Sequence, residues 1–302
     1  MTEAMFSPQA ECSPTPIITV AIPVFNAGRH LRLAVLSIVG QTFQDWELLI
    51  IDDGSTDDAL QSLADIHDCR IRILKDGNNK GLAARLNEAI DLASGQYFAR
   101  MDQDDVSYPE RFTRQMALLK SHPELDVVAV RVATISDDNE LIGSLPGRLD
   151  HNEICNRPWQ GFYLPHPTWM GRLAWFRAHR YACPGPYFCE DQELLLRSHA
   201  TSRFATVDQV LFAYRVRGRI NWKKQSKTRW TLFNIQLHYF IDTRQFYFAV
   251  LSLAAFTGRR VSDLLKVSRQ ALSGFQYSSQ RLDPAETEKW QEVLNTILWK
   301  PC

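Results

Sequence analysis

The residues with the clearest chemical potential are four consecutive positions: Asp102, Gln103, Asp104 and Asp105. They directly follow residues 97–101, a short apolar run typical of a strand that enters the core. Carboxylates this close repel one another, and at roughly 4 Å and an effective dielectric of about 20 each pair costs about 4 kcal/mol. A divalent cation offsets that repulsion, because Mg²⁺ and Mn²⁺ bind carboxylate oxygens together with substrate phosphate oxygens. The pattern therefore predicts a site for a phosphorylated ligand held through Mn²⁺ or Mg²⁺.

Aspartates in turns and helix caps are the competing interpretation of any acidic cluster. It is weaker for Asp102, Asp104 and Asp105, because one cap needs one carboxylate and not three. We prefer the turn interpretation for the other paired aspartates, which are Asp57, Asp58, Asp137 and Asp138.

Composition narrows the class of protein. The chain has 302 residues, of which 45% are hydrophobic and 23% charged, as in globular proteins. The net charge is zero, which gives no reason to expect nucleic acid as a partner. The six cysteines form no C-x-x-C pair and no H-E-x-x-H motif is present, so we expect no structural zinc and a reducing compartment.

No segment of the sequence predicts a membrane-spanning helix. Residues 1–16 contain acids and prolines without an apolar segment, and we expect a short disordered leader rather than a signal peptide. The longest apolar run, residues 246–256, is far shorter than the roughly 20 residues that a spanning helix needs.

Strand-like and helix-like segments alternate through the first half of the chain. The expected strands are residues 17–25, 46–52, 70–74, 97–101 and 126–136. The expected helices between them are residues 30–41, 56–66 with Thr56 as cap, 81–94 and 109–121. This rhythm predicts an α/β, Rossmann-like fold, a mostly parallel sheet flanked by helices, in which ligands bind at the carboxyl ends of the strands. Both acidic clusters, Asp52–Asp53 and Asp102–Asp105, fall at such ends.

The usual phosphate-binding loops of α/β folds are missing. The sequence has neither G-x-G-x-x-G nor G-x-x-x-x-G-K-[ST], and carboxylates stand where those glycines would be. Carboxylates hold a diphosphate through a cation and also accept hydrogen bonds from ribose hydroxyls and base N–H groups. The ligand expected from the residues alone is therefore a metal-bound nucleotide.

Three segments together resemble family 2 glycosyltransferases of the GT-A fold, in the inverting, bacterial envelope or exopolysaccharide type. They are VAIPVFNAGRHLRLAVLSIVGQTFQDWELLIIDDGSTDD, NNKGLAARLNEAIDLASGQYFARMDQDD and PERFTRQMALL. The resemblance is dense over residues 17–136 and continues sparsely through HPTWMGRLAWF and EDQELLLR to YRV. It implies inverting transfer of a sugar from a nucleotide-diphosphate sugar, with a UDP-sugar as the expected donor.

The resemblance also assigns roles at matching positions. It implies that the main-chain turn of Pro23, Phe25 and Asn26 lines the nucleotide. It also implies that the Asp53 carboxylate accepts a uracil-type N–H, and that Gly81 and Arg85 lie near the base and diphosphate.

The stretch Asp102–Asp105 resembles the family's D-x-D-D motif. Asp104 is expected to touch the ribose or donor sugar, and Asp105 to be the main metal ligand with Asp102 and Asp104 beside it. The family more often has Ala or Ser at the position of Gln103, and we expect little effect from that difference.

An inverting displacement also needs a base on the acceptor side. FCEDQELLLR resembles the family's Glu-Asp motif, which makes Asp191 the expected base, with Glu190 as its neighbour or substitute. From the residues alone, ordinary first-turn helix acids are the simpler interpretation. For His166 an acceptor-site role and a packed structural role stay open, whereas core packing is favoured for Trp159, Trp169 and Trp175.

The C-terminal third combines basic and aromatic residues. The segment between Tyr214 and Trp230 has no acid and contains Arg215, Arg217, Arg219, Lys223, Lys224, Lys227 and Arg229. Arg217 stands where the family often places a basic group that reaches the diphosphate. The rest is either a solvated loop face or, as we prefer, an anionic-membrane surface next to amphipathic helices. Those helices could equally pack on the core or on a second subunit.

The predicted organisation is a leader at 1–16, a GT-A catalytic domain at 17–215 and a basic, helical extension at 216–302. Within the domain, 17–136 is the nucleotide-sugar half and 137–215 the acceptor half. The expected activity is metal-dependent hexosyl transfer to the hydroxyl of a saccharide or lipid-linked acceptor, in polysaccharide, lipopolysaccharide or other glycoconjugate synthesis. The expected location is the cytoplasm, with peripheral contact to the inner membrane, and an oligomer stays open.

Three alternatives compete with this function. A sugar-phosphate nucleotidyltransferase would need a glycine- and arginine-rich first loop, which PVFNAGRH matches poorly, and the D-x-D-x-T of an aspartyl phosphatase is absent. A degenerate family member that acts as a scaffold is the non-enzymatic alternative. The presence of Asp53, Asp104, Asp105 and Asp191 argues against it.

Overall fold

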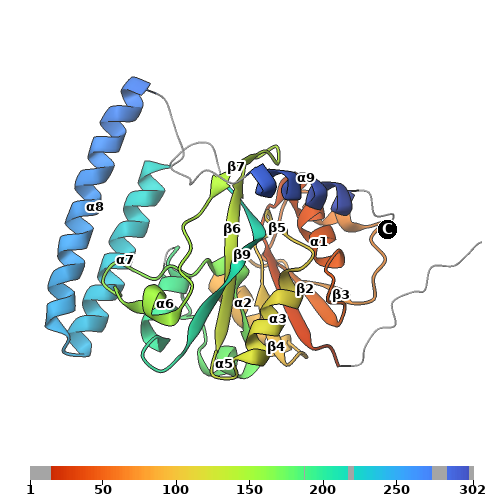
Figure 1. Cartoon of the computed structure of the whole chain (residues 1–302), viewed down its shortest axis with the longest axis horizontal. Helices are drawn as coiled ribbons and strands as arrows, with labels where there is room; N and C mark the ends of the chain where they lie inside the picture. Colours follow the sequence, from red (N-terminus) through yellow and green to blue (C-terminus); the bar gives the residue numbers. More distant parts are fainter. Residues whose placement is uncertain (1–14, 187, 217–220, 274–283, 299–302) are drawn as a thin grey trace, which may run out of the picture.

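The computed structural model describes residues 15–186, 188–216, 221–273 and 284–298. Nearly all of the predicted leader, and Arg217, therefore lie outside the described residues. Within them the chain forms one nine-stranded sheet flanked by helices, which confirms the predicted α/β class (Figure 1).

The sheet has the order β3-β2-β1-β4-β8-β6-β9-β5, with β7 paired to β6. The strands are β1 Ile18–Val24, β2 Trp46–Asp52, β3 Ile71–Lys75, β4 Tyr97–Arg100, β5 Val106–Ser107, β6 Val127–Ile135, β7 Leu141–Ser144, β8 Met170–Arg172 and β9 Phe204–Arg215. The first four predicted strands pair in parallel, as expected: β1 pairs with β2 and β4, and β2 pairs with β3. Beyond β4 the sheet is mixed, because β8 runs antiparallel to both β4 and β6 while β9 is parallel to β6.

Continuous apolar runs build the centre of the sheet because helices cover both of its faces. Every residue of β2 is buried, and so is β1 apart from the half-buried Pro23. The helices are α1 Leu31–Val39, α2 Leu82–Leu92, α3 Arg111–Ser121, α4 His151–Cys155, α5 Leu173–Ala178, α6 Glu190–Ser198, α7 Trp222–Asp242, α8 Phe246–Ser273 and α9 Pro284–Leu298.

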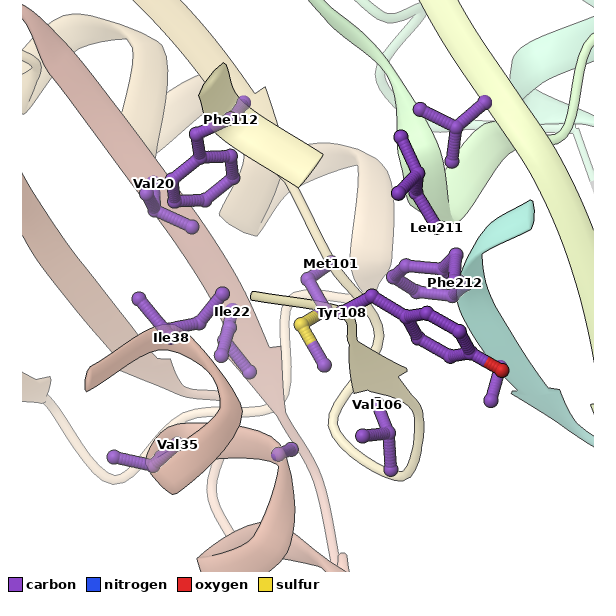
Figure 2. Close-up of a cluster of buried hydrophobic side chains, with 14 of the residues drawn as sticks. Val20, Ile22, Val35, Ile38, Met101, Val106, Tyr108, Phe112, Leu211 and Phe212 are labelled. Carbon is purple, nitrogen blue, oxygen red and sulfur yellow. The ribbon is translucent and has the colours of Figure 1, made fainter. Parts of the chain in front are cut away.

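The core fixes the acidic loop at both of its ends. Met101, immediately before the loop, and Val106, immediately after it, are fully buried. Figure 2 shows them in one cluster with Phe112 of α3 and Phe212 of β9. The loop between them therefore cannot move away without exposing apolar surface, which holds its carboxylates close together.

One predicted helix is different in the structure. Instead of a helix from Thr56 to Ile66, the chain forms a 3₁₀ helix at Ala59–Leu63. Thr56 does not cap it: Asp58 holds the N-cap position, and the backbone N–H and hydroxyl of Thr56 both donate to Asn26 Oδ1, at 2.8 and 3.3 Å. These tertiary bonds tie the segment after β2 to the turn after β1 and replace the local capping interaction that the sequence suggested.

The C-terminal helices cover two different parts of the molecule. α7 and α8 form a long hairpin on the far side of the sheet from β3, whereas α9 returns to lie beside α1 (Figure 1). Trp290 of α9 is fully buried, stacks on Tyr108 at 5.8 Å and donates Nε1–H to the Asn139 carbonyl. Among the described helices, none combines the length and the apolar character needed to cross a bilayer.

Candidate active site

The end of β2 builds one wall of the site through Asp53. This carboxylate is almost fully buried, and its Oδ1 accepts from the backbone N–H of Lys80 at 2.7 Å and from Arg85 Nε at 2.9 Å. Its Oδ2 accepts from the Gly81 N–H at 3.0 Å. Gly81 has φ +85, a conformation that favours glycine, which is how the chain presents its N–H to the carboxylate. Asp53, Gly81 and Arg85 therefore lie together, and their expected positions near the base and diphosphate stay predictions.

Arg85 is a positioning residue rather than an exposed ligand contact. Its side chain is only 1% exposed, and its guanidinium also bonds Asp76 and Glu88, each at 2.7 Å. The hydrogen bond to Asp76 raises the pKa of Arg85, and those to Asp53 and Glu88 add to it against the effect of burial. The arginine stays charged and holds Asp53 from behind.

The turn after β1 is fixed to the acidic loop by Gln103. Its Oε1 accepts from the Phe25 N–H at 2.7 Å, and its Nε2 donates to the Phe25 carbonyl at 3.0 Å. Asn26, with φ +50, completes the turn by donating its N–H to Ser55 Oγ. Sequence reasoning expected little from Gln103. The side-chain amide offers its donor and its acceptor on two separate atoms, which lets it bond both backbone groups of Phe25; Ala has neither, and Ser has a single, shorter hydroxyl.

The three carboxylates of the acidic loop occupy different environments. Asp102 pairs with Arg100, and both Asp102 and Asp104 line cavities. Asp105 is 1% exposed, its Oδ1 accepts from the Arg215 N–H at 2.8 Å, and its Oδ2 has no hydrogen-bond partner in the described structure. Burial, and then the charges of Asp102 and Asp104, raise the pKa of Asp105 well above its usual value. Its predicted role as metal ligand stays a prediction.

Buried arginines beneath the loop offset part of its negative charge. Arg100, Arg111 and Arg215 are each at most 5% exposed. Arg111 donates to the Arg100 carbonyl at 2.9 Å, and Arg215 donates from Nε to the Asp104 carbonyl at 2.8 Å. Burial and the nearby Arg100 lower the pKa of Arg111 to about 9. None of these roles was predicted, although Arg100 stands in an otherwise apolar strand and could have signalled one.

The predicted base and the acidic loop face one hollow. A cavity of about 360 Å³ is lined by Arg100 and Asp102 together with Glu190 and Asp191, at the start of α6. Burial raises the pKa of Asp191, and the hydrogen bond from Gln192 Nε2 at 3.0 Å opposes that shift.

Glu190 lies in the same cavity with a similar environment. Burial raises its pKa, and the neighbouring charge of Asp191 adds to the effect. Carboxyl groups with raised pKa values in a cavity are typical of acid–base catalysis, whereas helix-start acids that only complement the macrodipole are normally solvated.

His166 also lines this cavity but is packed tightly. Its Nε2 lies 2.8 Å from the Tyr181 hydroxyl, its ring meets Trp169 edge-on at 4.6 Å, and burial lowers its pKa well below the usual value. These contacts support the packed structural interpretation of His166, and its acceptor-site role stays a prediction. Trp169 and Trp175 are buried in the core as expected, and Trp159 stacks on Phe248.

A divalent cation fits the acidic loop only together with its ligand. Within the described ranges, no group of three His, Cys, Asp or Glu side chains is arranged to hold a metal. Mg²⁺ usually takes one or two carboxylates and completes its shell with phosphate oxygens and water. Asp102 and Asp104 at the cavity, with the unpaired Oδ2 of Asp105 beneath them, provide donors of that type.

Comparison with known proteins identifies the family and the fold of the chain. The sequence model of Glycosyl transferase family 2 matches residues 19–180. The putative glycosyltransferase EpsE of Bacillus subtilis is 38% identical over 116 residues, which cover 37% of this chain and 42% of EpsE. An uncharacterized glycosyltransferase of Haemophilus influenzae is 28% identical over 216 residues, 67% of this chain and 66% of that protein. The matched part is thus less than two thirds of either relative's length.

Two further similarities concern proteins with named ligands. The Escherichia coli protein WfgD, a UDP-Glc:alpha-D-GlcNAc-diphosphoundecaprenol beta-1,3-glucosyltransferase, is 30% identical over 140 residues, 46% of this chain and 54% of WfgD. The crystal structure of Staphylococcus aureus TarS 1-349 in complex with UDP-GlcNAc superposes with a TM-score of 0.61 over 93% of this chain and 80% of that one, at 16% identity. The structural similarity establishes the fold, including the C-terminal helices.

Proposed function

The chain belongs to glycosyltransferase family 2, and we propose that it transfers a sugar, with inversion, from a UDP-sugar to a hydroxyl acceptor. The observation that supports this proposal most is the shared cavity, in which Asp102 faces Glu190 and Asp191. An inverting displacement needs a group that stabilises the leaving diphosphate on one side of the anomeric carbon and a base on the other. The relatives' names and the nucleotide-sugar complexes of TarS support a UDP-sugar as donor.

In this mechanism the residues around Asp53 and Phe25 bind the nucleotide. The turn at Phe25 and Asn26 lines the base and ribose, and the free lone pair of Asp53 Oδ2 accepts the base N–H. Asp104 contacts the ribose or donor sugar. Arg85 and Gln103 touch no substrate, and they hold Asp53 and Phe25 in place.

On the acceptor side, Asp191 removes the proton from the attacking hydroxyl as the new bond forms. Burial favours its neutral form and so makes the carboxylate a stronger base than a solvated aspartate. Asp102 and Asp104, with Asp105, would hold Mn²⁺ or Mg²⁺. When bound, the cation supplies charge stabilisation for the departing diphosphate.

The test separates binding from transfer. Asp191→Asn should retain the affinity for UDP, measured by calorimetry with and without Mn²⁺, and lose turnover of the donor onto an acceptor. Near-normal turnover would exclude Asp191 as the base. Asp105→Ala should abolish the Mn²⁺-dependent part of UDP binding, and an undiminished affinity would refute its role at the metal. A scaffold protein would show no turnover even in the native sequence.

We also propose that the acceptor is a saccharide or a lipid-linked saccharide, handled at the cytoplasmic face of the membrane. The support is the outer face of α8, where large apolar side chains are exposed at helical spacing. They are Phe246, Tyr247, Val250, Leu253, Val261, Leu264 and Leu265. An apolar face of this kind suits the interface of a bilayer without crossing it.

Vesicle sedimentation tests the membrane contact. The native chain should sediment with phosphatidylglycerol vesicles, and Val250→Glu combined with Leu253→Glu should release it. Equal sedimentation of both would contradict the membrane role of this face. As the control for folding, the variant should be purified intact and should bind UDP with the same affinity as the native chain.

A further inference from the structure

A second cavity joins the acidic loop to the α7–α8 hairpin. Its volume is about 680 Å³, within the range of sites that hold a small ligand. Asp102 and Asp104 form one wall, and residues of α7 and α8 form the opposite wall. In the part of the chain that the structure describes, no residue before Asp102 lines this cavity. The turn at Phe25 and Asn26 and the Asp53 carboxylate, which the proposed mechanism assigns to the nucleotide, are therefore not part of it. The side of the cavity away from Asp102 and Asp104 is then open to the acceptor.

The α7–α8 wall carries a concentration of positive charge. Lys224, Arg229 and Arg259 line it, and Arg215 lies at its edge. Arg229 is neutralised by the buried Asp263, at 2.5 Å from Nε to Oδ2. A basic wall this close to the transfer point attracts an anionic group on the ligand.

On this wall, the charge of Arg259 is compensated less directly than that of Arg229. Its side chain is half-buried, and it donates to the Gln160 carbonyl, a neutral acceptor. Among the described residues, no carboxylate lies within salt-bridge distance of it. Burial and then the charge of Arg229 lower the pKa of Arg259, and the charge of Asp263 opposes that shift. Two neighbouring guanidinium groups that share one carboxylate are stabilised further when an anion binds beside them.

Phosphate is the anion that fits these donors. A guanidinium binds phosphate oxygens with two parallel hydrogen bonds, and an ammonium adds a compact charge. Thr228 and Asn221 provide further polar groups on the same wall. We propose that the acceptor carries a phosphate or diphosphate beside its accepting sugar, and that Arg259, Lys224 and Arg229 bind it. The inference rests on the proposed transfer reaction, because the cavity shares Asp102 with the hollow of Asp191.

The placement follows from the charges on the two walls. Asp102 and Asp104 would repel the acceptor's phosphate, so the phosphate lies at the α8 wall and the sugar points toward Asp191. Arg259 then determines the affinity for a phosphorylated acceptor and has no part in binding the donor.

Calorimetry in saturating UDP and Mg²⁺ tests this site with the donor position filled. The probes are farnesyl phosphate, glucose 1-phosphate and methyl glucoside, titrated into the full chain. The matched variants are Arg259→Gln and Arg260→Gln, adjacent residues on α8. Arg260 is exposed, bonds Ser226 Oγ and does not line the cavity.

A phosphorylated probe should bind the native chain, and methyl glucoside should not. Arg259→Gln should weaken that binding by about ten- to a hundredfold, the range for losing hydrogen bonds to a charged group. Arg260→Gln should leave it within about twofold, and both variants should retain the affinity for UDP. Preference for farnesyl phosphate would indicate a lipid-linked acceptor, and equal binding of glucose 1-phosphate a phosphate within a soluble or polymeric saccharide.

Two results would overturn the inference. One is the absence of binding by either phosphorylated probe to a chain that binds UDP. The other is equal weakening in both arginine variants, which would indicate nonspecific attraction to a basic surface. Failure of the native chain to bind UDP at all would instead refute the proposed function, so the two failures are distinguishable.

Discussion

The buried cluster around Arg85 gives a stability and binding prediction that can be calculated from its surroundings. Arg85→Met removes a cation that is 1% exposed and leaves the Asp53 carboxylate, 8% exposed, with its backbone donors alone. Breaking a buried ion pair by removing one partner costs about 3–5 kcal/mol. Asp76 and Glu88 are each about one-third exposed and regain water, so their pairs add little. We expect the free energy of unfolding to fall by about 3–4 kcal/mol.

The same substitution should weaken UDP binding, because Asp53 orients the loop at Lys80 and Gly81. A double-mutant cycle with Asp53→Asn isolates the pair. Removing both charges leaves no buried unpaired ion, so the double variant should be more stable than the sum of the single losses predicts, by about 1.5–3 kcal/mol. Urea unfolding measures the stabilities, and calorimetry measures the affinity for UDP.

The control for this cycle is a solvent-exposed pair of the same chemistry. Arg32 Nη1 lies 2.5 Å from Asp65 Oδ1, and the two side chains are 35% and 66% exposed. Arg32→Met should therefore cost at most about 1 kcal/mol. Additivity of the Arg85 and Asp53 losses to within about 0.5 kcal/mol, or a loss at Arg32 equal to that at Arg85, would refute the reasoning.

Two further predictions concern the site itself. Gln103→Ala removes both hydrogen bonds to the Phe25 backbone and should raise the Kd for UDP by about fivefold, because both bonds are exposed and each contributes about 0.5 kcal/mol, the low end for a neutral bond; an unchanged Kd would show that the turn holds its shape without the amide. Because the pKa of Asp191 is raised, kcat/KM should fall as pH falls through that raised value, and Gln192→Leu, which removes a bond to the charged form, should move this acid limb to higher pH. A limb that does not move in Gln192→Leu would indicate that another group titrates there.

The repeating part of the fold could be predicted because its signals are local. Strands β1, β2 and β4 and helices α1, α2 and α3 follow from apolar runs and helical spacing, and their boundaries agree with the prediction to within a few residues. Strands β8 and β9 were not predicted. β8 has three residues, too few for a periodic pattern, and it is held by pairing with β4 and β6.

The candidate site could be located from residue type alone only at the acidic loop, where three carboxylates are more than a cap needs. The roles expected of Asp53 and Asp191 came from the family resemblance, because single acids at a turn or a helix start have simpler interpretations. The second layer could not be found, because its function depends on which distant backbone a side chain reaches. Gln103 meets Phe25 across 78 positions of sequence, and Arg215 reaches the acidic loop across 111.

The negative charge of the acidic loop is balanced partly by buried arginines and partly by the ligand. Met101 and Val106 fix its ends in the core, so the carboxylates cannot separate when the site is empty. Arg100 neutralises Asp102, while Arg215 uses its guanidinium on the Asp104, Ser136 and Asn139 oxygens rather than on a carboxylate. The negative charge left over lies at Asp104, which lines the larger of the two cavities together with Asp102. The donor's diphosphate would be repelled there unless a cation came with it. Donor binding should therefore require Mn²⁺ or Mg²⁺, whereas the acceptor's phosphate, on the basic wall of α8, should need none.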